Sequence, residues 1–120
     1  MMKYLVSLMF VVSFSLFSTA QYNVGVEQFK QFKKQAKKQV IDVRRPDEYQ
    51  QGHIEGAVNI DYFSKDFKER LSKLDKKTPV YVYCRSGGRS AKAMQIMKAM
   101  GFEKVYNLKG GFLAWQQATK

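Results

Sequence analysis

The sequence predicts an α/β fold in which helices cover both faces of a parallel sheet. Short apolar stretches alternate with longer helical patterns from residue 21 to the end of the 120-residue chain. Such an alternation is typical of β-α-β units, whose parallel strands are buried on both faces. Neither an internal repeat nor a shift in composition divides this stretch. We therefore expect one domain over residues 21–120, long enough to enclose a single core.

The first half of this domain is expected to supply two helices and two strands. Aromatic residues and lysines over 26–38 follow the pattern of an amphipathic helix. Residues 40–43 are too few for a helix and too apolar for an exposed loop, which indicates a buried strand. Pro46 suits the first turn of a short helix that Gly52 ends, and residues 57–60 are the next candidate strand.

The second half continues the alternation. Apolar residues recur at spacings of four and three over 64–74, which predicts a helix with one apolar face. The β-branched and aromatic residues of 80–83 predict a buried strand, and residues 90–100 predict the helix that follows. A last strand is expected over 105–108, before a terminal helix that Gly110-Gly111 introduces.

The first twenty residues have the pattern of an export signal. Lys3 supplies a positive charge, residues 4–17 are apolar apart from serines, and small residues follow at 18–20. We expect cleavage of residues 1–20, which leaves Gln21 as the mature N-terminus. A retained membrane anchor is the alternative, but the apolar run is shorter than the ~18–20 residues that span a bilayer. The expected destination is the periplasm, with secretion from the cell as the alternative.

The chain is strongly basic, with a formal net charge of +11 that comes mostly from lysine. Five lysines lie within residues 26–38, where they fit the solvated face of the predicted helix. Nucleic-acid binding is not favoured, because no recognition motif accompanies the lysines and export is expected. The charge instead favours attraction of small anionic substrates. After cleavage of the leader, no stable membrane insertion is expected.

Cys84 is the only cysteine of the chain. A solitary cysteine in an exported protein cannot form an internal disulfide, so it is either an inert buried thiol or a reactive one. Glycine, serine and arginine surround it, which argues against burial among apolar residues. We therefore interpret Cys84 as reactive, and the lack of a resolving cysteine in the chain disfavours a dithiol redox cycle.

Residues 84–90, Cys-Arg-Ser-Gly-Gly-Arg-Ser, join the predicted strand 80–83 to a helix with Ser90 near its N-cap. A glycine-containing turn at a helix N-terminus presents backbone N–H groups that suit an anion. Arg85 and Arg89 add two positive charges. Together these features are expected to lower the pKa of the Cys84 thiol and favour the nucleophilic thiolate.

Four segments in the same order resemble the rhodanese superfamily, in particular its small single-domain sulfurtransferases. They are Ile41–Arg44 with Pro46, Glu48 and Tyr49, then residues 52–60, 83–90 and 107–115. Any one of these motifs alone is weak evidence, but four in register cover most of residues 21–120. The resemblance implies the rhodanese-like fold, with a central parallel sheet of about five strands and helices on both faces.

The resemblance also implies a function, sulfur transfer in two steps. The Cys84 thiolate attacks the outer sulfur of a donor such as thiosulfate, releases sulfite and becomes a persulfide. An acceptor such as cyanide or a thiol then takes the sulfur, and neither a metal nor an organic cofactor is needed. The expected substrate-binding residues are Arg85, Ser86, Gly87, Gly88 and Arg89. Of these, the glycines are expected to adopt positive φ and approach the sulfur, and the arginines to bind sulfite oxygens.

Three other functions remain open at this point. The first is a sulfur carrier or partner-binding module that exchanges sulfur with another protein at Cys84. The second is an inactive interaction domain, which the intact cysteine loop disfavours. A phosphatase or arsenate reductase is also disfavoured. Cysteine phosphatases use Cys-x5-Arg around a phosphoryl group, whereas Cys84 and Arg89 are separated by four residues.

Four further residues have two interpretations each. Asp42 could orient a loop arginine or form a buried pair that holds the fold, and the structural role is favoured. Arg44 could bind an anionic substrate, but an ion pair is favoured. His53 is the only histidine and is expected to make structural hydrogen bonds rather than act as a base. Ser90 is expected to be an N-cap first and a partner of the loop second.

Overall fold

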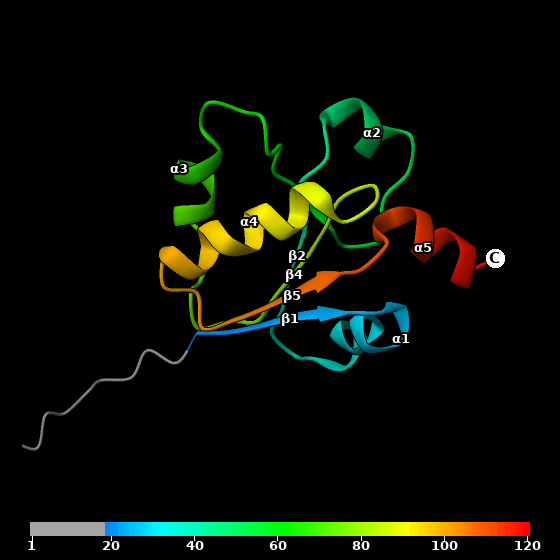
Figure 1. Cartoon of the computed structure of the whole chain (residues 1–120), viewed down its shortest axis with the longest axis horizontal. Helices are drawn as coiled ribbons and strands as arrows, with labels where there is room; N and C mark the ends of the chain where they lie inside the picture. Colours follow the sequence, from blue (N-terminus) through cyan, green and yellow to red (C-terminus); the bar gives the residue numbers. More distant parts are fainter. Residues whose placement is uncertain (1–18) are drawn as a thin grey trace, which may run out of the picture.

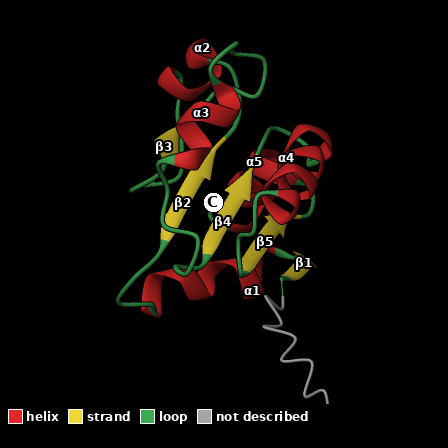
Figure 2. Ribbon diagram, turned by 90° about the vertical axis from the view of Figure 1, so that its left-hand side faces the viewer, coloured by secondary structure: helices red, strands yellow, loops and turns green. Residues whose placement is uncertain are grey.

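Alternating side chains of five short strands build a parallel sheet with an apolar layer on each face. The computed structural model describes residues 19–120. All strand pairs are parallel, and the strand order is β1-β5-β4-β2-β3 (Figure 2). The strands are β1 (Ala20–Val24), β2 (Gln39–Asp42), β3 (Val58–Asn59), β4 (Val80–Tyr83) and β5 (Lys104–Leu108). The helices are α1 (Val26–Phe29) with the 3-10 helix η1 (Lys30–Lys34), α2 (Pro46–Gln50), α3 (Phe67–Ser72), α4 (Gly88–Ala99) and α5 (Gly111–Ala118).

Helices lie on both faces of the sheet, as the sequence predicts. On β4, Val80 and Val82 point into one apolar layer, with residues of α3 and α4. Tyr81 and Tyr83 point into the other, with residues of α1, η1 and α5. Figure 1 shows α4 on one side of the strands and α1 on the other. This period-two alternation is what a buried parallel strand requires.

The alternation on β4 also determines where Cys84 lies. Cys84 continues the series of Val80 and Val82, and it belongs to the same apolar layer as α4. It follows directly after the last residue of β4, at the carboxyl edge of the sheet. Ligands of parallel sheets bind at this edge. The loop from Cys84 to Gly87 lies there beyond the arrowheads, between α4 and α5 (Figure 1).

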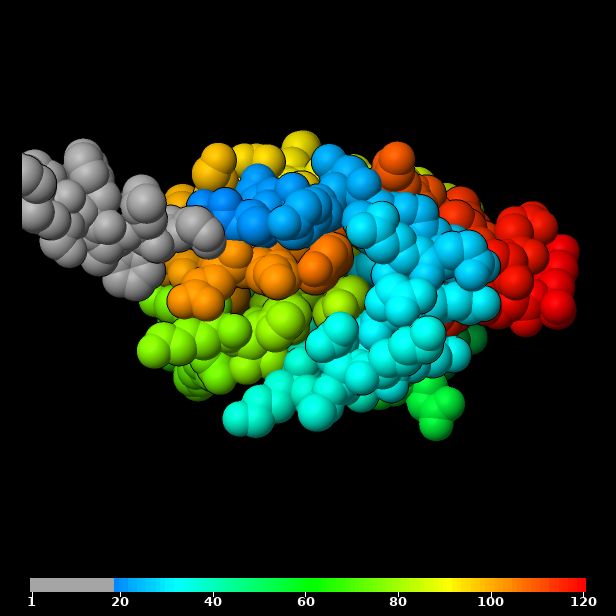
Figure 3. All heavy atoms as spheres, turned by 90° about the horizontal axis from the view of Figure 1, so that it is seen from below, coloured from blue at the N-terminus to red at the C-terminus, as the bar shows by residue number. Residues whose placement is uncertain are grey.

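The strand β1 is absent from the sequence prediction. Its residues do alternate between apolar and polar, but the expected leader ends at Ala20 and divides this short run, and only Val24 is buried. Pairing with β5 in register, from Ala20 opposite Lys104, makes this segment a strand. In the view from below, β1 lies along β5 next to the segment that contains α1 (Figure 3). Pairing with β5, rather than burial of an apolar face, therefore holds this edge strand in the sheet.

The helix predicted over 26–38 is shorter than expected. It begins at Val26 as α1, changes to the 3-10 helix η1 and ends at Lys34, with Gln35 extended. Phe29 and Phe32 are both buried. A 3-10 helix has three residues per turn, so it keeps residues three apart on one side. Four of the five lysines of residues 26–38 are exposed, as predicted for a solvated face, and Lys30 is half-buried.

Other element boundaries differ less. The strand predicted over 57–60 has two residues, and the helix predicted over 64–74 is reduced to α3. The helix predicted over 90–100 begins two residues earlier, at Gly88, and Gly101 follows it with φ 92°. A short helix begins at Pro46, as predicted. These differences concern helix and strand ends, where local sequence is least decisive.

Most of the predicted leader lies outside the described residues. Of residues 1–20, the structure describes only Thr19 and Ala20, and Ala20 is the first residue of β1. Among residues 19–120, no helix has the length and apolar character needed to cross a membrane.

Candidate active site

The Cys84 side chain is buried, with a relative exposure of 1%. The prediction that polar neighbours keep this cysteine out of apolar surroundings is wrong. The period-two alternation of β4 directs the side chain into the layer beneath α4, whatever follows in the loop. The sulfur nevertheless has polar partners: the Gly87 N–H lies 3.1 Å from Cys84 Sγ, and the Ser90 hydroxyl lies 3.4 Å from it.

The pKa of the Cys84 thiol is lowered. Burial is the largest single influence and raises the pKa, but hydrogen bonds to the sulfur outweigh it. They come from the Ser90 hydroxyl and from the backbone N–H groups of Ser90, Gly87 and Ser86. The direction agrees with the prediction. Its main cause is this ring of hydrogen bonds rather than the charges of Arg85 and Arg89.

Ser90 does not cap α4, contrary to the prediction. The N-cap is Gly87, in the left-handed region with φ 110°, and Ser90 lies in the first turn of the helix. Its hydroxyl lies 3.2 Å from the Gly87 carbonyl oxygen and 3.4 Å from Cys84 Sγ. A hydroxyl has one proton to donate and can turn it to either acceptor. The second predicted role, partner of the loop, describes Ser90 better.

Gly87 and Gly88 differ, although the same role is expected for both. Gly87 has a positive φ, as predicted, whereas the φ of Gly88 is not positive and this residue begins the helix α4. A Cβ atom at Gly88 would meet no heavy atom within 4 Å. The prediction of a required glycine conformation is therefore wrong for Gly88, because a helical residue needs no positive φ.

The helix α5 holds the backbone of the cysteine loop from the other side. The Phe112 N–H donates to the Cys84 carbonyl oxygen at 2.8 Å, and the Leu113 N–H donates to the Arg85 carbonyl oxygen at 3.1 Å. In a trans peptide, the N–H points opposite to the C=O. Binding the Arg85 carbonyl at α5 therefore turns the following N–H, that of Ser86, toward the sulfur.

Gly111 permits this close approach of α5 to the loop. Its φ is +59°, and a Cβ atom there would lie 2.5 Å from the Cys84 carbonyl oxygen and from the Arg85 carbonyl group. Cβ atoms do not approach backbone that closely, so a side chain would push α5 and the loop apart. The sequence motif contains this glycine, but the reason for it is visible only in the packing.

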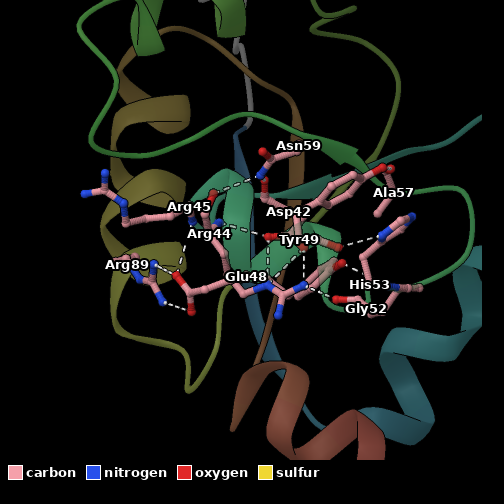
Figure 4. A network of polar contacts seen from close by, with 12 residues as sticks. Asp42, Arg44, Arg45, Glu48, Tyr49, Gly52, His53, Ala57, Asn59 and Arg89 are labelled. Carbon is pink, nitrogen blue, oxygen red and sulfur yellow. Dashed lines mark hydrogen bonds and ion pairs between the residues drawn. The ribbon is translucent and has the colours of Figure 1, made fainter.

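Arg89 is engaged in an ion pair with Glu48, which was not predicted. The two guanidinium nitrogens lie 2.7 and 3.1 Å from the two carboxylate oxygens (Figure 4). The hydrogen bond from Arg89 is the main cause that lowers the pKa of Glu48, and Glu48 in turn raises the pKa of Arg89. Arg89, the second residue of α4, therefore links the start of this helix to α2 and is not directed at a substrate anion.

Glu48 belongs to a family motif and, as an acid in the first turn of the helix that Pro46 begins, suits the positive end of that helix, but its pairing with Arg89 was not predicted. The signal that could have identified it is an acidic residue at the start of a predicted helix in a chain whose active loop carries two arginines. Arg85, by contrast, is exposed on the loop. Of the two arginines predicted to bind an anion, Arg85 is therefore the one that is free to contact a substrate.

Asp42 and Arg44 form a buried pair, the structural role that the sequence favours. The Arg44 Nη2 lies 2.7 Å from Asp42 Oδ2 and donates to the Gly52 carbonyl oxygen at 2.6 Å (Figure 4). The guanidinium carbon lies 4.4 Å from the centre of the Phe112 ring. Asp42 thus holds Arg44, not a loop arginine, and Arg44 links the end of β2 to α5.

Among residues 19–120, the contacts of His53 are structural. Its Nδ1 lies 2.9 Å from the Tyr49 carbonyl oxygen, and its ring stacks on the Tyr49 ring with a centroid distance of 3.7 Å. These are local contacts, four residues apart, as expected for a structural histidine.

Comparisons with known proteins agree with this architecture. The family model of the rhodanese-like domain matches residues 25–118. The Bacillus subtilis (strain 168) protein named uncharacterized protein YqhL is 44% identical over 79 residues, 66% of this chain and 61% of YqhL. Thiosulfate sulfurtransferase GlpE of Shewanella oneidensis is 32% identical over 97 residues, 81% of this chain and 94% of GlpE.

The likeness extends to solved structures. The crystal structure of a rhodanese-like domain protein from Staphylococcus aureus has a TM-score of 0.69 at 27% identity, covering 78% of this chain and 90% of that chain. The chain spans less than two thirds of YqhL but nearly all of GlpE. The order of elements, the cysteine loop between β4 and α4, and these matches lead to one conclusion. The chain belongs to the family of rhodanese-like domains, and sulfurtransferases are among its relatives.

Proposed function

We propose that this protein is a sulfurtransferase that carries the transferred sulfur as a persulfide on Cys84. The observation that supports the proposal most strongly is the ring of donors around the Cys84 sulfur, which lowers the pKa of the thiol although the side chain is buried. A thiolate is the nucleophilic form of cysteine. The same N–H groups of Ser86, Gly87 and Ser90 suit the negative terminal sulfur of a persulfide.

The reaction has two balanced steps. The Cys84 thiolate attacks the outer sulfur of thiosulfate or a similar donor, the S–S bond of the donor breaks, and its electron pair leaves with sulfite. A thiolate or cyanide then attacks the outer sulfur of the persulfide, and the electron pair returns to Cys84 Sγ. Arg85 is the loop arginine without an ion pair among residues 19–120, so we assign the sulfite oxygens to it.

The burial of Cys84 favours a second candidate, a sulfur carrier with little small-molecule turnover. At 1% exposure, the sulfur offers a small target to a free donor in solution. A protein donor that docks on the loop could deliver sulfur directly, and a protein acceptor could remove it. Both candidates require the Cys84 persulfide and differ only in which acceptors discharge it.

One experiment tests both candidates. The purified protein is incubated with thiosulfate, its intact mass is measured, and cyanide or a small thiol is then added. We expect a mass gain of one sulfur atom in the native protein and none in Cys84→Ser. Rapid loss of that sulfur to small acceptors supports the transferase, whereas a persistent persulfide supports the carrier. No mass gain with thiosulfate or with other persulfide donors would contradict both.

We further propose that residues 1–20 direct export and are then removed. The support is the sequence pattern of a charged start, an apolar run and small residues. Cleavage after Ala20 would leave a chain that begins within β1. N-terminal sequencing of the protein from periplasmic and culture-medium fractions tests this: we expect Gln21 first, and an uncleaved chain in the cytoplasm would contradict it.

A further inference from the structure

A groove of about 410 Å³ lies between α4 and the segment that leads into α3. Figure 1 shows this green segment and α3 beside α4, on the same side of the sheet. The residues that line the groove are Tyr62, Phe63, Ser64, Lys65, Phe67, Lys68 and, from α4, Ile96. None of them belongs to the cysteine loop, so the groove is a separate surface of the described chain.

The floor of the groove is aromatic and continuous with the core. The Tyr62 ring lies edge-on to the Phe67 ring, with a centroid distance of 5.3 Å, and edge-on to the Phe63 ring at 5.2 Å. Phe67 is buried, and Tyr62 and Ile96 pack against the same apolar layer. The Phe63 side chain is 60% exposed, which makes it the most exposed large apolar residue of 19–120.

Backbone hydrogen bonds hold Phe63 in its exposed position. The Tyr62 N–H donates to the Val43 carbonyl oxygen at 3.1 Å, and the Phe63 N–H donates to the Asp61 carboxylate at 2.9 Å. The Ser64 N–H donates to the Asp61 carbonyl oxygen at 3.0 Å. The turn itself therefore directs the Phe63 ring into water. An exposed ring that adjoins other apolar side chains is typical of a surface that a second molecule covers.

Two lysines determine the charge around this apolar floor. Lys65 and Lys68 are exposed and have no acidic partner within 4 Å among residues 19–120. The acids of the same segment, Asp61, Asp66 and Glu69, do not line the groove. The complementary ligand is therefore an apolar side chain flanked by carboxylates.

We propose that this groove is a docking site for an acidic segment of a partner protein. An apolar side chain of the partner enters between Phe63 and Ile96, and carboxylates beside it contact Lys65 and Lys68. A membrane surface fits less well, because a bilayer receives side chains that protrude, whereas a hollow is filled by a side chain of the partner. The inference goes beyond the proposed function and does not depend on it.

Binding is measured with a set of labelled synthetic peptides in which glutamates flank one leucine, phenylalanine or tryptophan. The protein is titrated into each peptide, and fluorescence anisotropy reports the complex. We expect saturable binding that Phe63→Ala weakens at least about fivefold, as expected for an apolar anchor. Lys65→Gln and Lys68→Gln should each weaken it about two- to fivefold, as expected for one exposed ion pair. Peptides with glutamine in place of glutamate should also bind more weakly.

The matched controls are Lys104→Gln, which removes an exposed lysine, and Tyr22→Ala, which removes an exposed aromatic ring. Neither residue lines the groove, so both variants should bind the peptides as the native protein does. Equal weakening by control and groove substitutions, or no saturable binding of any peptide, would overturn the inference.

Vesicles of phosphatidylglycerol and phosphatidylcholine are the second probe, with sedimentation as the measurement. We expect Phe63→Ala to leave vesicle binding unchanged. Vesicle binding that Phe63→Ala weakens, in a protein that binds none of the peptides, would assign the groove to a membrane surface and overturn the inference. Because the Phe63 side chain is exposed, Phe63→Ala should keep the native fold and the native rate of persulfide formation on Cys84, which is measured separately by mass.

Discussion

Two helices of this protein begin at a pair of glycines, and both approach the cysteine loop, but with different results. Gly87 precedes α4 and Gly88 is its first residue, and Gly110 and Gly111 have the same positions at α5. In each pair the first glycine is the N-cap and has positive φ, 110° at Gly87 and 75° at Gly110. The start of α4 gives its N–H groups to the Cys84 sulfur, whereas the start of α5 gives them to loop carbonyl oxygens.

The second glycine of each pair explains the difference. Gly88 is helical and has free space around it, whereas Gly111 has positive φ and lies against the backbone of Cys84 and Arg85. The N–H groups at the start of α4 therefore bind the sulfur, whereas the start of α5 packs against the loop and orients it. The same sequence pattern, Gly-Gly before a helix, thus serves chemistry at one place and geometry at the other.

The largest expected effect comes from filling the contact between α5 and the loop. Gly111→Ala places a Cβ 2.5 Å from loop backbone at positive φ, so we expect a loss of stability of at least about 2 kcal/mol. Persulfide formation should also be lost, because the Ser86 N–H no longer points at the sulfur. Gly88→Ala is the matched control, with stability unchanged or raised by up to about 1 kcal/mol. Urea unfolding measures the stability of both variants. Equal destabilisation would contradict the different roles of Gly88 and Gly111.

A smaller effect is expected from removing the hydroxyl donor at the start of α4. Ser90→Ala deletes a hydrogen bond to the thiolate, so the pKa of Cys84 should rise by about one unit, worth about 1.4 kcal/mol. The thiolate fraction increases as pH rises through the pKa. The ascending limb of the rate of persulfide formation should therefore move to higher pH by the same amount.

Ser86→Ala is the control for this shift. Ser86 contributes to the lowered pKa of Cys84 through its backbone N–H, which the substitution retains. The pKa of Cys84 is measured from the ultraviolet absorbance of the thiolate as a function of pH, in the native protein, in Ser90→Ala and in Ser86→Ala. If both serine variants shift the pKa of Cys84 equally, the hydrogen bond from the Ser90 hydroxyl is not what lowers it.

The smallest effect is expected at the ion pair that links the start of α4 to α2. Glu48→Gln removes the partner of Arg89, and we expect a loss of about 0.5–1 kcal/mol at neutral pH for this partly exposed pair. The pKa of Glu48 is lowered in the folded protein. Its contribution is therefore fully present above the ordinary glutamate pKa of about 4.3 and is lost as pH falls through the lower folded value.

The difference between native protein and Glu48→Gln should consequently vanish in acid. Denaturant unfolding at neutral and acidic pH measures it, with Glu55→Gln, an exposed glutamate, as the control. A stability difference that grows as pH falls would contradict the sign of this linkage. A double-mutant cycle with Arg89→Gln isolates the energy of the pair itself.

The sequence by itself determined the order of the helices and of the strands β2 to β5 along the chain, the parallel sheet, and the position of Cys84 at the carboxyl end of β4. Those features depend on local patterns: apolar runs of strand length, the prolines and glycines that begin and end helices, and a glycine turn before α4. The lowered pKa of the thiol was also predictable in direction, since N–H groups at a helix start favour an anion.

Only the tertiary structure decided how the loop's charges are used and how far the sulfur is buried. Arg89 pairs with Glu48, 41 residues away in sequence, and this contact leaves Arg85 as the available loop cation. The strand β1 exists because β5 lies beside it, and Gly111 is required because α5 approaches the loop. Each of these depends on segments that are distant along the chain meeting in space, and no local pattern encodes which segments meet.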